Sequence, residues 1–228
     1  MSRYGQFCPV AKAAEIFAER WTPLIVRELF CGSRRFNELE QGLPRIPRSL
    51  LVQRLRSLER AGVIARRANF DKRVNEYHLT EAGTELAQVV VGLGEWGQRW
   101  VNSEVRPEDV DLDVLIWDLH RRIHVDRMPQ GRTVVQFDFY GVQNRSYWLV
   151  VQHGEASVCR GDPGFEVDLQ VIADALAFHR VWIGHRSMDE ALRREEVVLE
   201  GPTEMVRAFP RWLAYSMFAS IRPAAKAA

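Results

Sequence analysis

The chain has 228 residues, of which 46% are hydrophobic and 27% are charged, and its formal net charge is only +1. This composition is that of a globular protein with one large or two small domains. No apolar run approaches the roughly 20 residues that cross a bilayer, and the first ten residues lack the apolar core of a signal peptide, so we expect a cytoplasmic protein with no membrane partner.

The first half of the chain predicts a series of short helices. Proline at the first position opens one helix, and Thr22 followed by Pro23 predicts a second, with Thr22 as its cap. Gly62 ends the fourth helix. The predicted ranges are 9–17, 22–30, 35–41 and 47–61.

A hairpin and a long helix complete this half. Two short strands over 63–67 and 74–79 surround a charged turn, and Thr80 caps a helix over about 81–101. Short helices followed by a hairpin and a further helix are the order of a winged helix-turn-helix module. The polar stretch 102–108, which contains Pro107, separates a domain over 1–104 from one over 108–222.

The second half predicts an α+β domain. Residues 111–127 have the spacing of an amphipathic helix, and strands are predicted over 133–140, 147–151 and 155–159. Asp168 is predicted to cap a helix that ends near 178, and Ser187 with Glu190 to cap another. A short strand over 197–199 precedes a last helix, which opens at Gly201-Pro202 and is predicted to contain Met205, Phe209, Trp212, Leu213 and Met217.

The near-zero net charge conceals a basic segment. Residues 31–75 contain 11 Lys and Arg against 4 Asp and Glu, a local charge of +7, whereas residues 102–228 have a charge of −4. A polyanion is the natural partner of such a segment, although a solvated face that binds nothing would have the same charge.

The helix predicted over 47–61 separates these alternatives. At 100° per residue its leucines cluster on one face, while Ser49, Gln53, Arg56 and Arg60 cluster on the opposite face. An α-helix fits the major groove of DNA, where Arg reads guanine and Gln reads adenine. Basic residues on the neighbouring helix, turn and wing would contact phosphates. The predicted DNA-binding residues are Arg34, Arg35, Arg45, Arg48, Ser49, Gln53, Arg56, Arg60, Lys72 and Arg73.

Residues 8–100 resemble the HxlR family of winged-helix bacterial regulators. The motifs that carry the resemblance are residues 8–10 (CPV), 20–22 (RWT), 25–29 (IVREL), 35–39 (RFNEL), 51–55 (LVQRL), 58–62 (LERAG) and 77–83 (YHLTEAG), followed by Trp96 and Trp100. The resemblance implies a homodimer that binds an inverted-repeat operator in double-stranded DNA and regulates nearby genes. It also implies that the helices around 9–18 and 81–101 form much of the dimer contact.

Three positions qualify this resemblance. Pro47 stands where the family commonly has a capping Ser or Thr, and Val52 stands where a small hydroxyl residue is common. Cys8 matches a cysteine that some members use as a redox sensor, which would require a thiolate favoured by Lys12 or Arg3. The alternative, which we favour, is that Cys8 is a small buried apolar side chain.

Residues 111–217 resemble the sterol-carrier-protein-like fold. The motifs are residues 137–139 (FDF), 147–151 (YWLVV), 162–165 (DPGF), 167–169 (VDL), 181–184 (VWIG), 197–202 (VVLEGP) and 209–213 (FPRWL). The resemblance implies a helix-covered sheet with an apolar tunnel for a lipophilic molecule. The predicted ligand-binding residues are Phe137, Phe139, Trp148, Trp182, Met188, Phe209, Trp212 and Met217. Aromatic and Met side chains suit such a ligand, but each of them also suits a filled core.

No pattern in the sequence predicts an enzyme, a cofactor or a metal site. His120 and His124 are four residues apart but lack a third ligand, and the three cysteines are not paired in spacing. Gly92, Gly94 and Gly97 match a dinucleotide motif by letter alone, because they lie within a predicted helix. The sequence therefore predicts a dimeric DNA-binding regulator with a lipophilic effector. The alternative is a lipid or small-molecule carrier in which the first domain mainly dimerises.

Overall fold

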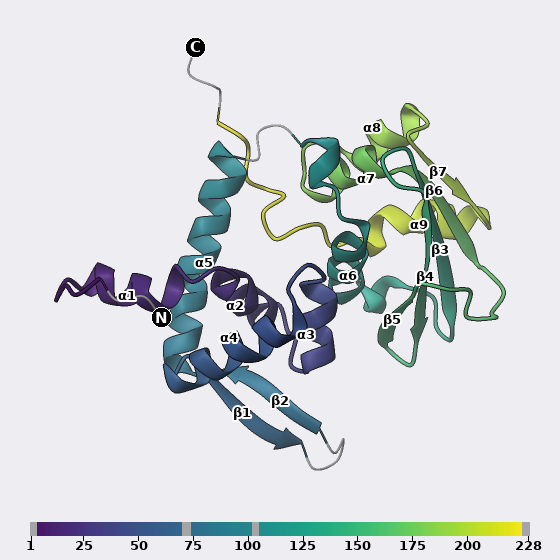
Figure 1. Ribbon diagram of the computed structural model, residues 1–228. Helices are drawn as coiled ribbons and strands as arrows, with labels where there is room; N and C mark the ends of the chain where they lie inside the picture. Colours follow the sequence, from purple (N-terminus) through teal and green to yellow (C-terminus); the bar gives the residue numbers. More distant parts are fainter. Residues whose placement is uncertain (1–3, 70–73, 102–104, 225–228) are drawn as a thin grey trace. The chain divides into compact units, whose positions relative to one another are not determined.

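A computed structural model describes residues 4–69, 74–101 and 105–224 (Figure 1). The chain forms two compact units, residues 1–94 and 95–228, and one continuous helix, α5, extends from the first into the second. Among the described residues, no helix combines the length and the apolar character that a membrane span requires.

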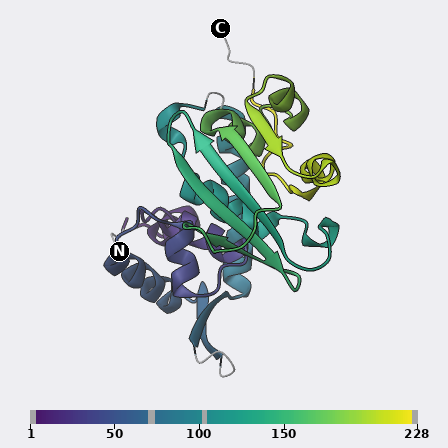
Figure 2. The same cartoon turned by 90° about the vertical axis from the view of Figure 1, so that its right-hand side faces the viewer.

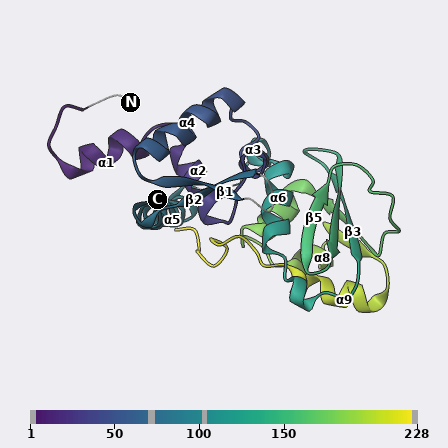
Figure 3. The same cartoon turned by 90° about the horizontal axis from the view of Figure 1, so that it is seen from below.

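The first unit has the winged helix-turn-helix order that the sequence predicts. Its elements are α1 (Pro9–Phe17), α2 (Thr22–Phe30), α3 (Phe36–Gly42), α4 (Arg48–Arg60), β1 (Ile64–Asn69), β2 (Val74–Leu79) and α5 (Glu81–Trp100). β1 and β2 pair as an antiparallel hairpin, and Thr80 caps α5 by accepting a hydrogen bond from the amide of Gly83 at 3.1 Å. Figure 3 shows the hairpin and α4 from below.

One predicted cap in this unit is wrong. Thr22 is the first residue of α2 and is buried, so it does not cap the helix. Trp21 occupies the N-cap position in the left-handed conformation, with φ 78°, and makes no side-chain capping hydrogen bond. The turn into α2 therefore depends on the backbone of Trp21.

A buried carboxylate fixes the turn between α2 and α3. Glu28 is fully buried and accepts hydrogen bonds from Arg27 at 2.7 Å and from Ser33 at 3.1 Å. Gly42, at the end of α3, lies so close that a Cβ there would be 2.0 Å from a Glu28 carboxylate oxygen. Because a buried charge needs its hydrogen-bond partners, this cluster determines how α2 and α3 pack.

The second unit is a mixed sheet packed with helices. The strand order is β5-β4-β3-β6-β7, and only β3 and β6 are parallel neighbours (Figure 2). The strands are β3 (Thr133–Tyr140), β4 (Arg145–Gln152), β5 (Glu155–Cys159), β6 (Leu169–Asp174) and β7 (Val197–Glu200). The helices are α6 (Leu112–Arg122), α7 (Ala175–Trp182), α8 (Met188–Arg193) and α9 (Thr203–Trp212), with 3₁₀ turns at Pro107–Asp109 and Val125–Arg127.

The helix predicted over 168–178 is wrong in its first half. β6 is a strand beside β3, and its side chains alternate between buried and half-buried positions. Asp174, not Asp168, caps the following helix by accepting from the amide of Ala177 at 2.8 Å. Asp168 instead accepts from the amide of Val134 at 2.8 Å. The short apolar run fits both periods, and pairing with β3 selects the strand.

Two other predicted helices are shorter than expected. α6 ends at Arg122, and the chain then forms a separate 3₁₀ turn, so His124 is not on the same helix as His120. α9 ends at Trp212, so Leu213 and Met217 lie outside it. The residues after Trp212 form an irregular segment. Its backbone forms hydrogen bonds with α6 and α7, through Arg122 and Trp182, and does not continue the helix.

We expect Gly42→Ala to destabilise the first unit by about 1–3 kcal/mol, because its methyl group would displace the Glu28 carboxylate. Gly92→Ala is the matched control, since a Cβ at that helical position meets nothing within 4 Å. It should leave the free energy of unfolding unchanged or raise it by about 0.5–1 kcal/mol. Urea denaturation followed by circular dichroism measures both changes, and equal stabilities of the two variants would contradict this role of Glu28.

Candidate nucleic-acid interface

Helix α4 exposes the polar face that the sequence predicts. Its leucines at 51, 55 and 58 are buried in the core of the first unit. Ser49, Gln53, Arg56 and Arg60 are exposed. Together with Val52 and Glu59, these four line a hollow of about 480 Å³ on the helix surface. The structure thus brings the predicted base-reading residues together on one face.

The arginines of α4 differ in the hydrogen-bond and ion-pair partners of their side chains. Arg48 pairs with Glu40 at 3.1 Å and lies over the ring of Phe36. Arg54 points away from the exposed face and pairs with Glu19 at 2.7 Å. Arg60 donates to the hydroxyl of Ser57 at 3.3 Å.

Arg56 is different from these three. Within the described part of the chain, its guanidinium has no hydrogen bond or ion pair, and it stands beside the exposed amide of Gln53. A free guanidinium and a free amide on one helix face can both form bidentate hydrogen bonds to base edges. Gln53 and Arg56 are therefore the best placed of the predicted residues for direct contact with bases.

The predicted phosphate-contacting residues have more varied positions. Arg34 is half-buried, and its guanidinium donates to the carbonyls of Leu29 and Ser33 at the end of α2. Arg35 is half-buried at the N-cap of α3, 3.7 Å from Glu38, whereas Arg45 is exposed. Lys72 and Arg73 lie outside the described residues.

The wing has two further basic residues that are not among the predicted DNA-binding residues. Arg66 and Arg67 are exposed on β1, and the alternation of the strand places them on opposite faces of the hairpin. Opposite Arg67 in the register is Glu76, whose pKa is lowered chiefly by a hydrogen bond from Asn69. The alternation of side chains along a predicted strand could have identified these residues, because it places one arginine on each face of the wing.

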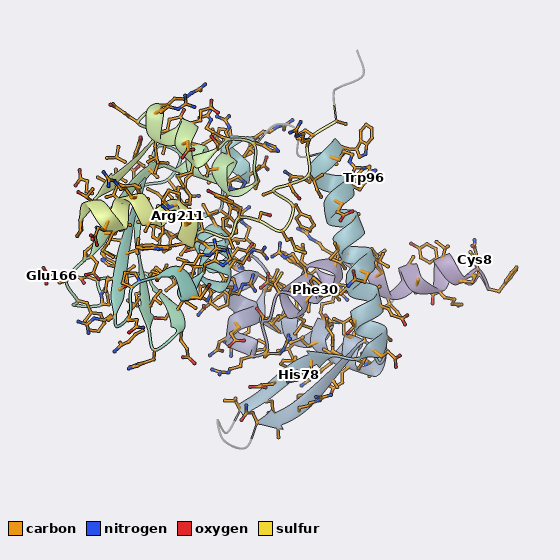
Figure 4. The ribbon with its side chains drawn as sticks, turned by 180° about the vertical axis from the view of Figure 1, so that it is seen from behind. Cys8, Phe30, His78, Trp96, Glu166 and Arg211 are labelled. Atoms are coloured by element: carbon orange, nitrogen blue, oxygen red, sulfur yellow. The ribbon has the colours of Figure 1, made fainter. Side chains whose placement is uncertain are left out.

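Cys8 lies at the N-cap of α1 and is half-buried (Figure 4). Lys12, which was expected to favour its thiolate, is 3.4 Å from Glu15. Arg3, the other expected cation, lies outside the described residues. The described structure therefore supplies no cation dedicated to the Cys8 sulfur.

The eight predicted ligand-binding residues do not line one cavity. Phe137, Phe139 and Phe209 are buried and contact one another or Phe178, with ring centroids 5.4–6.1 Å apart, so they fill a core. Trp182 and Trp212 belong to the same core. Trp148 pairs with Gln136 and lies on the opposite face of the sheet from Phe137.

Met188, which also belongs to this core, and Met217 are the two of the eight that line a cleft. The cleft has a volume of about 700 Å³ and lies in the second unit, beside the irregular segment that follows α9. Among the described residues, no group of three or more His, Cys, Asp or Glu side chains is arranged to hold a metal ion.

Comparison with known proteins places the first unit in a family. Residues 16–105 match the family model described as HxlR-like helix-turn-helix. YvaP, an uncharacterized HTH-type transcriptional regulator of Bacillus subtilis, is 37% identical over 100 residues, which are 43% of this chain and 93% of YvaP. The chain belongs to the HxlR-like helix-turn-helix family.

Other similar proteins match about the same share of the chain. Rv3095, an uncharacterized HTH-type transcriptional regulator of Mycobacterium tuberculosis, is 44% identical over 100 residues, and the match covers 43% of this chain and 61% of Rv3095. The reduced form of the transcriptional regulator YodB from B. subtilis matches with 29% identity and a TM-score of 0.38, over 44% of this chain and 100% of YodB. Membership of the HxlR-like family identifies the chain as a transcriptional regulator of the winged helix-turn-helix type.

Arg54→Ala and Arg56→Ala provide a matched test of these two arginine environments. Arg54→Ala should lower the free energy of unfolding by about 1–3 kcal/mol, because it breaks a half-buried ion pair and leaves Glu19 without its partner. Arg56→Ala should change it by less than about 0.5 kcal/mol, because the side chain is exposed and unpaired. Urea denaturation measures both, and a larger loss for Arg56→Ala would contradict its placement.

Proposed function

We propose that this member of the HxlR-like family is a homodimeric, sequence-specific DNA-binding regulator whose second unit senses a lipophilic small molecule. The observation that carries the DNA-binding part is the α4 face of Ser49, Gln53, Arg56 and Arg60. Burial of three leucines turns that face outward, and Gln53 and Arg56 have no competing partner in the described chain. Arg45 and the exposed wing arginines would add contacts to phosphates.

The dimer is supported by apolar side chains that the single chain leaves exposed on α1 and α5. Val10 lies on α1 and is 75% exposed, and Phe7, two residues before the helix begins, is 98% exposed. On α5, Leu93, Trp96 and Trp100 are about half exposed. Figure 4 shows where Trp96 lies on this helix. Large exposed apolar patches mark protein interfaces. A second copy of the chain is the proposed partner, and two α4 helices in one dimer would match an inverted-repeat operator.

The sensing role rests on the second unit. We propose that this unit is sterol-carrier-protein-like, because the inner face of its sheet packs against α6, α7 and α9, and because it contains a cleft large enough for a small molecule. Most of the sequence motifs of that fold lie wholly or partly on its strands and helices, whereas residues 162–165 lie in the loop between β5 and β6. The cleft, rather than the filled aromatic core, is the proposed ligand site.

A second candidate function is a carrier of lipophilic molecules, in which the first unit serves only to dimerise. The cleft favours it to the same extent as it favours a sensor. The two functions differ in whether α4 binds DNA. Failure to recover any operator would favour the carrier.

We expect operators to be recoverable from random duplexes by selection with the full-length dimer. In mobility shifts, Gln53→Ala and Arg56→Ala should each weaken binding by about tenfold, because each removes a bidentate base contact. Arg207→Ala, an exposed arginine on α9, is the control and should bind as the unchanged protein does. Affinity should also fall as salt is added. Equal losses for Arg56→Ala and Arg207→Ala, or binding insensitive to salt, would refute this use of α4.

Leu93→Glu and Trp96→Glu should shift the chain from dimer to monomer, since each places a charge in the proposed apolar interface. Sedimentation velocity measures the assembly state. Val198→Glu introduces the same charge at an exposed position on β7 and should leave the dimer intact. If the unchanged chain sediments as a monomer at micromolar concentration, the proposed dimer is wrong.

A further inference from the structure

One wall of the cleft in the second unit is formed by residues that follow α9. The cleft lies between the loop that joins α7 to α8 and the segment 213–221. Hydrogen bonds hold that segment, because the amide of Ser216 donates to the carbonyl of Trp182 at 3.0 Å. Just before the segment, the carbonyl of Trp212 accepts from the amide of His124 at 2.7 Å. Gly184 lets it approach closely, since a Cβ there would be 2.0 Å from the carbonyl oxygen of Ala219. The cleft is therefore preformed, because these contacts hold the segments that line it.

Arg122 is the charged side chain that gives this cleft its chemistry. It lies in the last turn of α6, is half-buried, and its Nε donates to the carbonyl of Tyr215 at 2.9 Å. This bond fixes the plane of the guanidinium. In the described part of the chain, no carboxylate lies within 4 Å of Arg122, so both terminal nitrogens remain available. Two parallel N–H groups in a fixed plane are the complement of a carboxylate.

The other charged groups of the cleft do not replace this role. Arg186 is ion-paired with Glu196. Asp189 is exposed in the first turn of α8, where the helix dipole favours it. Burial, and secondarily Asp189, raise the pKa of Tyr215, so its phenol stays neutral and would not repel an anion. Arg122 is thus the cation in the cleft without a carboxylate partner among the described residues.

The rest of the lining combines apolar side chains with three serines, Ser187, Ser216 and Ser220. Val181, Met188, Pro210 and Met217 contribute side chains, and methionine adapts readily to apolar ligands of irregular shape. We propose that the cleft binds an amphipathic carboxylate, whose charged group pairs with Arg122 and whose apolar part lies against Met188 and Met217. This inference names the ligand class of the proposed sensor and rests on that proposed function.

The same loop connects the cleft to the last turn of α5. Gly184 and Arg186 line the cleft, whereas Ile183 and His185 bind Gln98 of α5. Gln98 is 5% exposed and donates to the carbonyl of Ile183 at 3.1 Å, with His185 Nε2 also at 3.1 Å. The amide of Ala224, beyond the cleft wall, donates to the carbonyl of Arg99 at 2.8 Å. A ligand that displaces the loop or the C-terminal segment therefore alters how α5 is held, and Gln98 is the positioning residue that transmits the change.

Calorimetric titration of the full-length protein tests the cleft, with dodecanoate and dodecanol as probes below their aggregation limits. Dodecanoate should bind at least about tenfold more tightly than dodecanol, because only the carboxylate pairs with Arg122. Arg122→Gln should abolish this preference and leave the affinity for dodecanol unchanged. Arg127→Gln is the matched control, since Arg127 also donates to a backbone carbonyl, that of Arg211, but lies outside the cleft lining.

Arg122→Lys gives a second test that does not depend on the folding of the Gln variant. It keeps the charge but loses the paired donors, so its preference for dodecanoate should fall between those of the unchanged protein and Arg122→Gln. Equal affinities for the two probes in the unchanged protein, no binding of either, or equal loss in Arg122→Gln and Arg127→Gln would overturn the proposal.

Operator binding distinguishes this inference from the proposed function. Saturating dodecanoate should change the operator affinity of the unchanged protein by at least about fivefold, a typical coupling between two sites. It should not change the operator affinity of Gln98→Leu, which should still bind dodecanoate. Dodecanoate binding without any effect on operator affinity would overturn the role of Gln98 and leave the cleft assignment intact. Failure of the free protein to bind any operator would instead refute the proposed function.

Discussion

The burial of the leucine face of α4 is the constraint on which the proposed interface depends. Leu51, Leu55 and Leu58 lie in the core of the first unit, and each buried leucine contributes about 2 kcal/mol. Rotating the helix to hide its polar face would lose all three contributions. It would also break the pair between Arg54 and Glu19. The exposure of Gln53 and Arg56 is therefore a consequence of core packing.

The buried carboxylate of Glu28 extends this constraint to the neighbouring helices. It links α2 to the turn that contains Ser33, and it requires a glycine at position 42. Arg34, on the same turn, accepts at its backbone carbonyl a hydrogen bond from the amide of Tyr77, at 2.7 Å. The turn, α3 and the wing strand β2 are thus held by one connected set of polar contacts. An interface for duplex DNA needs this rigidity, because its contacts lie on several elements.

In the second unit, the aromatic core and the proposed ligand site are different places, although the amino-acid composition does not distinguish them. Phe137, Phe139 and Phe178 contact one another edge to face or stacked, and they belong to the buried core of this unit. The cleft lies at the edge of this core, where the chain leaves α9 and continues as an irregular segment. There the lining mixes methionines with Arg122, a combination that suits a molecule with one charged end. The loop beside the cleft also holds Gln98, so ligand binding and the position of α5 share one structural element.

The sequence by itself determined most of the first unit, because its signals are local. Leucines at helical spacing, Pro9, Gly62 and the cap at Thr80 fix α1, α4 and α5 within a few residues, and the polar face of α4 follows from the same period. The strands over 133–140 and 155–159 were predictable for the same reason. Only the tertiary structure decided that residues 169–174 form a strand, since their short apolar run fits either period until β3 pairs with it. It also decided which arginines are free and which are paired. Partners such as Glu19 for Arg54 lie 35 positions away in the chain, and no local pattern encodes them. The cleft has the same origin, because its walls come from α6, the α7–α8 loop and the residues that follow α9, which only folding brings together.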